Sequence, residues 1–436
     1  MLSPGAEARA GSGPPFDLLV RNAAEIVTCA GEHTEPAESA LGVVERGAIG
    51  VRGATVQYVG PEARLPPGAV DTATEVLDAA GGVVTPGLVD PHTHLVFAGE
   101  RAREFELRAR GASYLEIASS GGGIASTVKA TRAASEDELV GLALPRLQRL
   151  LDQGVTTVEV KSGYGLSLEH ELKLLRAVRR LAREQPVELV PTLLCAHAVP
   201  EELRSARDRY VSQCIEEIIP AVAQERLAGF CDAFCEEGAF SKEEVRRILH
   251  AARAHGLRPR LHADQLTALG GAELAAELGA ASADHLEQVS EAGIAALARA
   301  GVTAVLAPTS TLFLRVRPFA PGRRLRECGV NVALATNVNP GSSMTESVSL
   351  VLGLACLENG LSAAEALWGF TRGAALALGL ERHGRIAEGD PADLVVFGCA
   401  SWRHLPYHVA VNHVRAVVKR GRIVCRPTAL ATTLCA

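Results

Sequence analysis

Residues 82–101 of the chain read GVVTPGLVDPHTHLVFAGER, an apolar strand pattern that runs directly into two histidines. His92 and His94 lie two positions apart in a segment that we expect to be extended, so both imidazoles should project to the same side. Two neutral imidazole nitrogens on one face suit zinc or ferrous iron. An HxH pair occurs on many protein surfaces, so its meaning depends on what the rest of the chain places beside it.

The strand that carries this pair is the first of a repeating series. Between residues 83 and 383, short apolar segments alternate with amphipathic helical segments, which is the pattern of β–α–β units. Ser135, Ser241 and Ser362 each precede a glutamate by three residues, which predicts capping boxes at three helix starts. The expected strands are residues 83–89, 155–160, 187–196, 230–235, 258–261, 281–283, 302–306 and 330–336. Eight strand–helix units predict an α/β fold, a (β/α)8 TIM-like barrel over residues 83–383. A doubly wound sheet is disfavoured because no GxGxxG turn follows the first strand.

Histidines and asparagines stand where several of these strands are expected to end. In a (β/α)8 barrel the active site lies at the carboxyl ends of the strands. The first strand runs into His92 and His94, and later strands run into His197, His262, His285 and the segment Asn337–Asn339. Histidines at four expected strand ends indicate a shared metal site. The remaining histidines have no comparable placement and receive no function: His33, His170, His250, His255, His383, His404, His408 and His413.

The two ends of the chain share a different texture. Residues 17–82 contain short strand patterns separated by turn residues, and residues 384–436 return to that texture with ADLVVFG, VRAVVKRG and RIVC. Neither part has enough apolar surface to fold alone, so we expect one small β-sandwich domain assembled from both ends. Residues 1–16 are rich in glycine, proline and alanine and are expected to be disordered.

Charge and composition argue against several classes of protein. With a formal net charge of −6, the chain offers no basic field for nucleic acid. Its ten cysteines form no CxxC pair, which indicates a reducing compartment. The first residues lack the apolar core of a signal peptide, and no segment reaches the roughly 20 apolar residues of a membrane span. We therefore expect a soluble cytoplasmic protein without nucleic-acid or membrane partners.

Several longer motifs carry a family resemblance. The segments GVVTPGLVDPHTHLVFAGER, GGGIASTVKATR, VEVKSGYGL, CAHAVP, DAFCEEGAFS, HADQ, SADHLEQ and NPGSS follow one another in this order. They resemble successive blocks of the imidazolonepropionase family, within the amidohydrolase superfamily of metal-dependent hydrolases. KSGYG with CAHAVP is the more discriminating pair, whereas GRIAEGDPADLVVF near the C-terminus is general to the superfamily. The likeness covers nearly the whole chain.

The resemblance implies a small-molecule substrate and a reaction. The reaction is hydrolysis of 4-imidazolone-5-propanoate to N-formimidoyl-L-glutamate in histidine degradation, by water that a metal ion activates. One metal ion is implied, zinc or iron in a divalent or trivalent state. Lys161 ends the second strand, whereas the superfamily's bridging lysine belongs to the fourth, so a second metal is not expected. The resemblance leaves a homodimer open.

The resemblance also implies site residues, carried over position by position. His92, His94 and His262 would be metal ligands, and His285 would contact the reacting group. An arginine suits the propionate because a guanidinium binds a carboxylate through two parallel hydrogen bonds. The implied substrate pocket comprises Arg101, Tyr164, His197, Asn339, Gly341 and Ser342.

Two positions depart from the family pattern. The family has an aspartate at the end of the last strand, as metal ligand and proton acceptor, and commonly a glutamate after HAD; this chain has Asn337 and Gln265. Each amide keeps the shape of a carboxylate but takes no proton near neutral pH. We keep Asn337 among the expected metal and catalytic residues, and Gln265 among the catalytic and substrate-binding residues. The preferred interpretation is a site retuned as a unit, with an engineered or decayed site left open.

Three hypotheses for function follow. The first is an active imidazolonepropionase, and the second is an amidohydrolase that acts on another cyclic amide or amidine. The third is a catalytically silent paralogue that binds the imidazolone, which Asn337 and Gln265 favour. Retention of the other pocket residues argues against the third hypothesis, since a silent protein has less reason to keep them.

Overall fold

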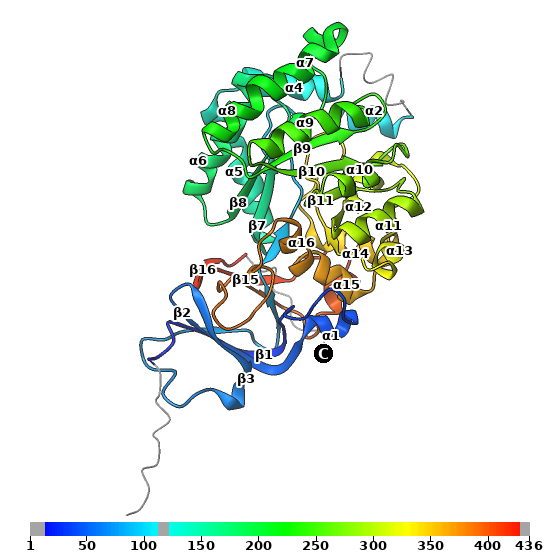
Figure 1. Cartoon of the computed structure of the whole chain (residues 1–436). Coiled ribbons are helices and arrows are strands. Elements are labelled where there is room, and N and C mark those ends of the chain that lie inside the picture. The colour runs from blue at the N-terminus through cyan, green and yellow to red at the C-terminus, as the bar shows by residue number, and fades with distance from the viewer. Residues whose placement is uncertain (1–13, 112–121, 428–436) are drawn as a thin grey trace, which may run out of the picture.

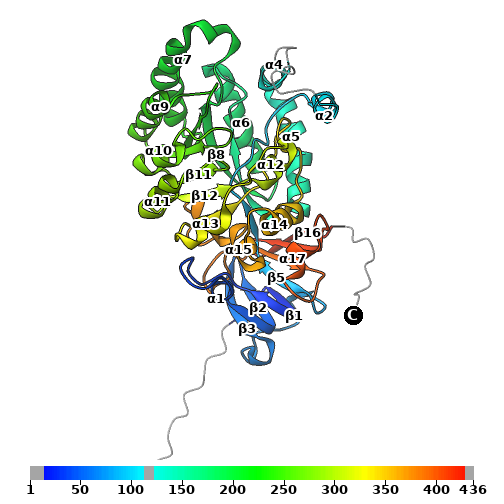
Figure 2. The ribbon, with the colours of Figure 1, turned by 90° about the vertical axis from the view of Figure 1, so that its right-hand side faces the viewer.

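The protein contains two sheets of eight strands each, in a computed structural model that describes residues 14–111 and 122–427. One sheet is parallel and curls into a barrel with helices around its outside (Figure 1). The other is a mixed sheet built from both ends of the chain, and it lies against one end of the barrel (Figure 2). The predicted fold class, a (β/α)8 barrel with a small β-domain from both chain ends, is confirmed.

The barrel strands pair in parallel, each with the next along the chain. They are β6 (Leu88–Asp90), β7 (Val155–Lys161), β8 (Glu188–Ala196), β9 (Phe230–Cys235), β10 (Arg258–Ala263), β11 (Ser282–His285), β12 (Thr303–Leu306) and β13 (Val332–Leu334). The first and last strands are joined just beyond their ends. There the amide of Asn337 donates to the carbonyl of His92 over 3.1 Å, and the amide of His94 donates to the carbonyl of Val338 over 3.0 Å. These bonds hold the HxH segment directly beside Asn337.

Helices cover the outside of the barrel. α5 (Glu136–Asp152), α9 (Lys242–Ala254) and α15 (Ala363–Gly369) begin with the three predicted capping boxes, which are confirmed. The other helices of this region are α2 (Ala102–Ala109), α4 (Ile124–Ala133), α6 (Leu168–Glu184), α7 (Arg207–Gln213), α8 (Ile219–Gln224), α10 (Gly271–Glu277), α11 (Glu291–Ala300), α12 (Pro308–Leu314), α13 (Gly322–Glu327), α14 (Val348–Leu357) and α16 (Arg372–Ala377), with a 3-10 turn η2 (Glu201–Ala206) and a π-turn η3 (Cys214–Ile218). None of the described helices is both long and apolar enough to cross a membrane.

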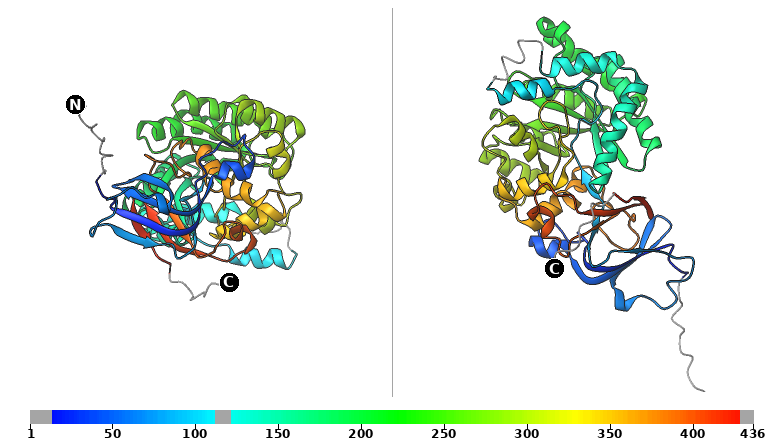
Figure 3. Two further views of the ribbon diagram at one scale, coloured as in Figure 1. Left: turned by 90° about the horizontal axis from the view of Figure 1, so that it is seen from below. Right: turned by 180° about the vertical axis from the view of Figure 1, so that it is seen from behind.

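The mixed sheet joins the two ends of the chain, as Figure 3 shows by the blue and red strands that lie together. β14 pairs antiparallel with β5 on one side and with β15 on the other. The strands are β1 (Leu18–Val27), β2 (Val43–Arg52), β3 (Thr55–Pro61), β4 (Glu75–Asp78), β5 (Val83–Pro86), β14 (Leu394–Phe397), β15 (Val414–Lys419) and β16 (Arg422–Cys425), with short helical pieces α1 (Ala37–Leu41), η1 (Glu62–Arg64) and α17 (His404–Tyr407).

The first predicted barrel strand, residues 83–89, was wrong in its first half. β5 belongs to the mixed sheet, and the barrel begins at β6. Gly87 lies between the two, where a Cβ atom would come within 2.2 Å of the Thr156 hydroxyl, so only glycine lets the chain pass so close to β7. A continuous apolar run does not reveal the change of sheet, because both halves are buried. The other seven predicted strands overlap β7 to β13.

The predicted disordered tail, residues 1–16, falls mostly outside the described residues. Its last residue, Phe16, is buried, and its amide donates to the carbonyl of Ala69 over 2.8 Å. A Cβ atom on Gly50 would lie 2.3 Å from the Phe16 ring, so this ring packs directly on the backbone of β2. Phe16 is therefore part of the mixed sheet's packing, in contrast to the prediction for that residue.

Successive side chains of β14 pack in two different cores, which allows the contribution of the mixed sheet to the free energy of unfolding to be tested. Val395 packs in the core that surrounds the barrel, whereas Leu394 packs in the core of the mixed sheet. We expect Leu394→Ala to lower the free energy of unfolding by about 2–5 kcal/mol, as for other buried leucines. Leu357→Ala, at an exposed position, should change it by no more than about 0.5 kcal/mol. Denaturant unfolding measures both, and equal effects of the two substitutions would contradict a shared domain built from both chain ends.

Candidate functional site

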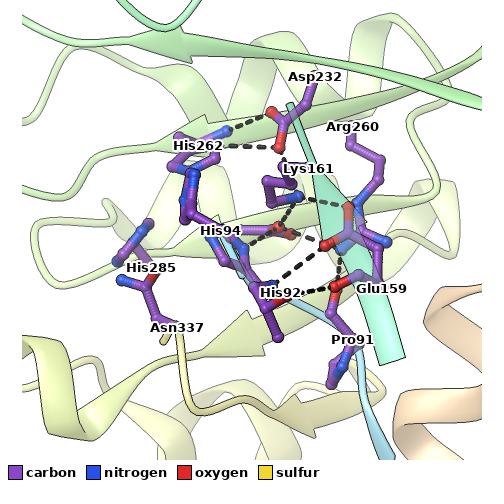
Figure 4. Close-up of polar contacts among 12 residues, drawn as sticks. Pro91, His92, His94, Glu159, Lys161, Asp232, Arg260, His262, His285 and Asn337 are labelled. Carbon is purple, nitrogen blue, oxygen red and sulfur yellow. Dashed lines mark hydrogen bonds and ion pairs between the residues drawn. The ribbon is translucent and has the colours of Figure 1, made fainter. Parts of the chain in front are cut away.

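The histidines at the strand ends converge on one point (Figure 4). The ring centre of His92 lies 4.5 Å from that of His262 and 5.3 Å from those of His94 and His285. Nε2 of His94 lies 3.4 Å from Nε2 of His262. One nitrogen from each of His92, His262 and His285 lies within 4.8 Å of the other two, as the ligands of a single ion would. The structure therefore brings together the four histidines that the sequence placed at the ends of three strands.

Several buried ring nitrogens of this cluster have no protein partner. Nε2 of His92, Nδ1 of His94 and Nδ1 of His285 make no hydrogen bond to any part of the chain that the structure describes. Burial lowers the pKa of His92, His94 and His262, so these imidazoles are neutral at neutral pH and keep a free lone pair. Neutral imidazoles with free nitrogens are what a transition metal ion binds. The residues present thus fit a metal ion.

Two aspartates orient the histidine rings. Nδ1 of His92 donates to Oδ2 of Asp284 over 2.6 Å, and Nδ1 of His262 lies 3.0 Å from Oδ2 of Asp232. A carboxylate on Nδ1 fixes the tautomer that leaves the Nε2 lone pair free, and it raises the basicity of that nitrogen. Both rings therefore present Nε2 to the point where the histidines meet.

Two buried cations hold these aspartates in turn. Nζ of Lys161 lies 2.7 Å from Oδ2 of Asp232 and 2.9 Å from Oε1 of Glu159. Nη2 of Arg260 lies 3.1 Å from Oδ2 of Asp284. Burial opposes ionisation of Asp232, but His262 and Lys161 outweigh it and hold the pKa of that carboxyl well below its usual range. Burial opposes the charge of Lys161 as well, yet Asp232 and Glu159 raise its pKa.

The sequence analysis missed the residues behind the ligands: Glu159, Asp232, Arg260 and Asp284. All four are fully buried charges inside otherwise apolar strands. Such charges are rare unless they are paired, so their presence in VEVK, FCDAFC, RPRLH and SADH was a usable signal. Lys161, which the sequence analysis considered only as a metal-bridging group, is one of their partners.

The backbone is strained where the strands end at this site. Asp264, His285, Leu286 and Asn337 all have positive φ, at 49°, 84°, 70° and 51°. A left-handed conformation costs a residue other than glycine on the order of 1–3 kcal/mol, and such residues cluster at functional sites. Tertiary hydrogen bonds stabilise these turns, including one of 3.1 Å from the Leu286 amide to the Ala263 carbonyl.

Two expected substrate residues lie beside the histidine cluster. The His197 ring stacks on that of His94 with centres 5.0 Å apart and an angle of 21°. The Tyr164 ring lies 5.4 Å from His197 and 5.9 Å from His94. Burial, followed by the neighbouring His262, lowers the pKa of His197 to about 3, so this ring is neutral. Nδ1 of His197 lies 3.0 Å from the carbonyl of Gly163, which fixes the ring in place.

The Arg101 side chain packs against the loop that follows the last barrel strand, β13. A Cβ atom on Gly341 would lie 2.1 Å from Nη1 of Arg101, so the guanidinium rests on the backbone of this glycine. Nε and Nη2 of Arg101 both lie 2.7 Å from Oε2 of Glu104. One edge of the guanidinium is therefore engaged by the protein, and the Nη1 end lies at the loop.

Asn339 shapes that loop. Its Oδ1 accepts from the amides of Gly341 and Ser342, both over 2.8 Å, and its Nδ2 donates to Oγ of Ser342 over 2.8 Å. Nδ2 also donates to the carbonyl of Asn337 over 2.7 Å. The three loop residues expected in the substrate pocket are thus held together next to Asn337.

The two amides that replace carboxylates differ in placement. Figure 4 shows Asn337 next to His285 at the histidine cluster. Gln265 is buried in the loop directly after β10. Within the described ranges, no hydrogen bond joins the Gln265 side chain to the cluster. Asn337 thus lies at the cluster, whereas the role expected of Gln265 stays a prediction.

Comparison with curated proteins identifies close relatives. The amidohydrolase family model matches residues 75–116 and 115–425. The chain is 69% identical over 411 residues to an imidazolonepropionase of Myxococcus xanthus, an alignment that covers 94% of this chain and 98% of that protein. It is 54% identical over 426 residues to an imidazolonepropionase of Anaeromyxobacter sp. strain K, covering 97% of this chain and 100% of the relative.

Solved structures share the fold at low sequence identity. A 5-methylcytosine deaminase from Klebsiella pneumoniae, liganded with 5-fluorocytosine, superposes with a TM-score of 0.73 at 16% identity, covering 95% of this chain and 99% of that one. An adenosine deaminase from Xanthomonas campestris with bound zinc has a TM-score of 0.67 at 21% identity, covering 94% and 93%. These likenesses concern the fold of both sheets together.

The carboxylate behind His262 offers a test of the metal centre. We expect Asp232→Asn to weaken metal binding by about 10–100-fold, the usual loss when a partner of a metal-ligating histidine is removed. Metal content after dialysis against a competing chelator measures this. Asp208→Asn, which breaks only an exposed ion pair with Arg247, is the matched control and should leave metal content unchanged. Equal metal retention by the two variants would contradict the assignment of the histidine cluster as a metal site.

Proposed function

The chain belongs to the imidazolonepropionase family of amidohydrolases, and we propose that it hydrolyses 4-imidazolone-5-propanoate to N-formimidoyl-L-glutamate in histidine degradation. The observation that carries this function is the 69% identity to a curated imidazolonepropionase over 94% of the chain. The site supports it, because the buried neutral histidines lie beside an arginine, a tyrosine and a loop that suit a small anionic heterocycle. Turnover of the imidazolone by the metal-loaded protein is the direct test.

We propose His92, His94 and His262 as the metal ligands, with the amide oxygen of Asn337 as a weaker fourth, and zinc or iron as the ion. A metal ion held there supplies Lewis acidity and makes water a nucleophile at neutral pH. His92 and His262 contribute the nitrogens that Asp284 and Asp232 leave free. His94 contributes the ring whose Nε2 lies 3.4 Å from that of His262. Three neutral imidazoles accept zinc and iron alike, so metal analysis has to decide between them.

We propose that the substrate is positioned by the residues that lie between the histidine cluster and the loop after β13. Arg101 would bind the propionate carboxylate from its Nη1 end, which Glu104 leaves free. Tyr164 and His197 would hold the imidazolone ring beside the histidines, since His197 already stacks on His94 and Tyr164 lies next to both rings. Asn339, Gly341 and Ser342 would form the wall next to Arg101.

The reaction needs a group that moves protons. Water adds to the ring carbonyl carbon, the ring C–N bond breaks, and the leaving nitrogen takes a proton. We propose His285 for this transfer, because an imidazole both accepts and donates a proton near neutral pH. Its Nδ1 lies 3.9 Å from Oε1 of Glu287, and that oxygen accepts a hydrogen bond of 2.6 Å from Thr311. The Glu287 carboxylate is thus held near the His285 ring, without a direct hydrogen bond to it. Asn337, being an amide, takes no part as a base.

Cellular location and oligomeric state are two further properties expected of this protein. We infer a cytoplasmic enzyme, which the free and mostly buried cysteines of the described residues support. A homodimer stays a prediction.

Arg101 can be tested by a change that keeps its charge. Arg101→Lys should lower kcat/KM by the equivalent of about 1.5–3 kcal/mol, because lysine does not reproduce the hydrogen bonds of the guanidinium to a carboxylate. Metal content should stay the same. Arg110→Lys, at an exposed position on the same segment, is the control. An unchanged kcat/KM for Arg101→Lys would mean that Arg101 serves only the contact with Glu104.

His285 is tested by its removal. We expect His285→Ala to lower kcat severely while the protein keeps its metal, because the ligands remain and the proton-transfer group is gone. General acid–base assistance contributes about 10²–10⁴-fold, which sets the size of the loss. Loss of metal together with activity would instead assign His285 to the ligands, and retained activity would remove it from the site.

Asn337→Asp tests how this site differs from others of its family. A carboxylate beside the histidines should bind the metal at least as tightly as the amide does, since it adds a negative charge next to a cation. A large gain in kcat would indicate a decayed site, whereas little change or a loss would indicate a site retuned around the amide. If neither protein hydrolyses the imidazolone although both hold metal, the chain is a silent binder, and the proposed activity is wrong.

A further inference from the structure

A second group of histidines lies on the surface, in the segment between β14 and β15. Residues 404–413 read HLPYHVAVNH, with His404 and His408 four positions apart and His413 five positions further. None of the three takes part in the site described above. Figure 2 shows α17, which begins at His404, beside α14 and β16, on the outside of the protein.

The three imidazoles lie close together. Nδ1 of His408 is 2.8 Å from Nε2 of His413, and the two ring centres are 4.9 Å apart. The His404 ring stacks on the His408 ring at 5.4 Å with an angle of 13°. Residues four apart on a helical turn face the same side, and the His408 amide donates to the His404 carbonyl over 2.9 Å. The 4.9 Å between His408 and His413 falls within the 4.5–5.3 Å found from His92 to the other histidines of the buried cluster, and the 5.4 Å between His404 and His408 lies just above it.

The local surroundings leave these rings available to a ligand. His408 is exposed, and His404 and His413 are partly exposed. In the described residues, the hydrogen bond between His408 and His413 is the one polar contact that their ring nitrogens make. A neutral imidazole has one N–H and one lone pair, so the ring that donates this hydrogen bond frees its facing nitrogen when its proton moves to its other ring nitrogen. Nδ1 of His408 and Nε2 of His413 then both offer a lone pair.

We propose that His404, His408 and His413 form a second metal site, on the surface, for a transition-metal ion that prefers imidazole ligands. The ion takes the place of the proton between Nδ1 of His408 and Nε2 of His413. No choice of one nitrogen per ring brings all three within 4.8 Å of one another, so His404 joins by rotation of its side chain. Imidazole sites favour copper, nickel and zinc over manganese and iron, so Ni²⁺ is a suitable probe.

A bound ion would link the two ends of segment 404–413, which lies between β14 and β15 of the mixed sheet. His404 begins α17 and His408 is the residue directly after this helix, whereas His413 directly precedes β15 at Val414. The chain between them carries exposed apolar side chains at Tyr407, Val409 and Val411. Coordination would therefore close the segment 404–413 into a loop and slow its opening. This site is independent of the proposed hydrolase activity.

Equilibrium dialysis of the metal-loaded enzyme against Ni²⁺ tests the proposal. We expect the parent protein to bind one additional Ni²⁺ per chain. His408→Ala should weaken this binding by at least about tenfold, since even indirect partners of a metal ligand contribute that much. His404→Ala should weaken it as well. Hydrogen exchange of residues 404–413 should slow with Ni²⁺ in the parent and not in His408→Ala.

Two controls separate this site from the hydrolase centre. His255→Ala removes an exposed histidine at the end of α9 and should leave Ni²⁺ binding unchanged. Imidazolone turnover by His408→Ala should equal that of the parent, so a failure of the proposed function would not affect the result. The proposal is wrong if the parent binds no additional Ni²⁺, or if His408→Ala binds it as tightly as the parent does.

Discussion

The site rests on a buried ion-pair network behind the histidines. Lys161 and Arg260 are fully buried and face three carboxylates, those of Glu159, Asp232 and Asp284. Burying such charges costs several kcal/mol per ion, and removing one partner of a buried pair costs about 3–5 kcal/mol, because it strands the other. We therefore infer that the network serves to fix the orientation of the His92 and His262 rings and does not serve stability alone. With neutral histidines, three carboxylates against two cations leave one negative charge, which a bound metal cation would offset.

Asn337 changes the charge on the open side of this arrangement. A carboxylate there would face the metal from the front while Asp232 and Asp284 act through the histidines from behind. His92, His94, His262 and the Asn337 amide are all neutral, so a metal ion held there would keep more of its positive charge, which would favour ionisation of nearby water. The proton then has to leave by another group, and His285 is the side chain beside Asn337 with the right chemistry (Figure 4). Water activation and proton removal would thus be divided between the metal and His285.

The barrel's shortest strands determine where the site lies. β6 and β13 have three residues each, and their ends are joined by hydrogen bonds between His92 and Asn337 and between His94 and Val338. Buried Asp90 strengthens this junction, because its Oδ2 accepts from the Thr336 hydroxyl over 2.5 Å. The positive φ angles of His285 and Asn337 follow at the same end of the barrel. The hydrogen bonds that close the barrel therefore also place the side chains of the site, so the geometry of the site depends directly on the fold.

The sequence by itself determined the elements and the metal-binding residue types. Periodicity, capping boxes and strand-end histidines predicted the barrel, and His92, His94, His262 and His285 do converge. Each of these signals depends on residues close together in the sequence, so it can be recognised without knowing the tertiary contacts. Tertiary structure alone decided that residues 83–86 join the mixed sheet, since their pairing partners there are β1 and β14, and β14 lies more than 300 residues further along the chain. It also decided that Lys161 pairs with Asp232 and that Glu104 holds Arg101, because no spacing in the sequence reveals which buried charges meet.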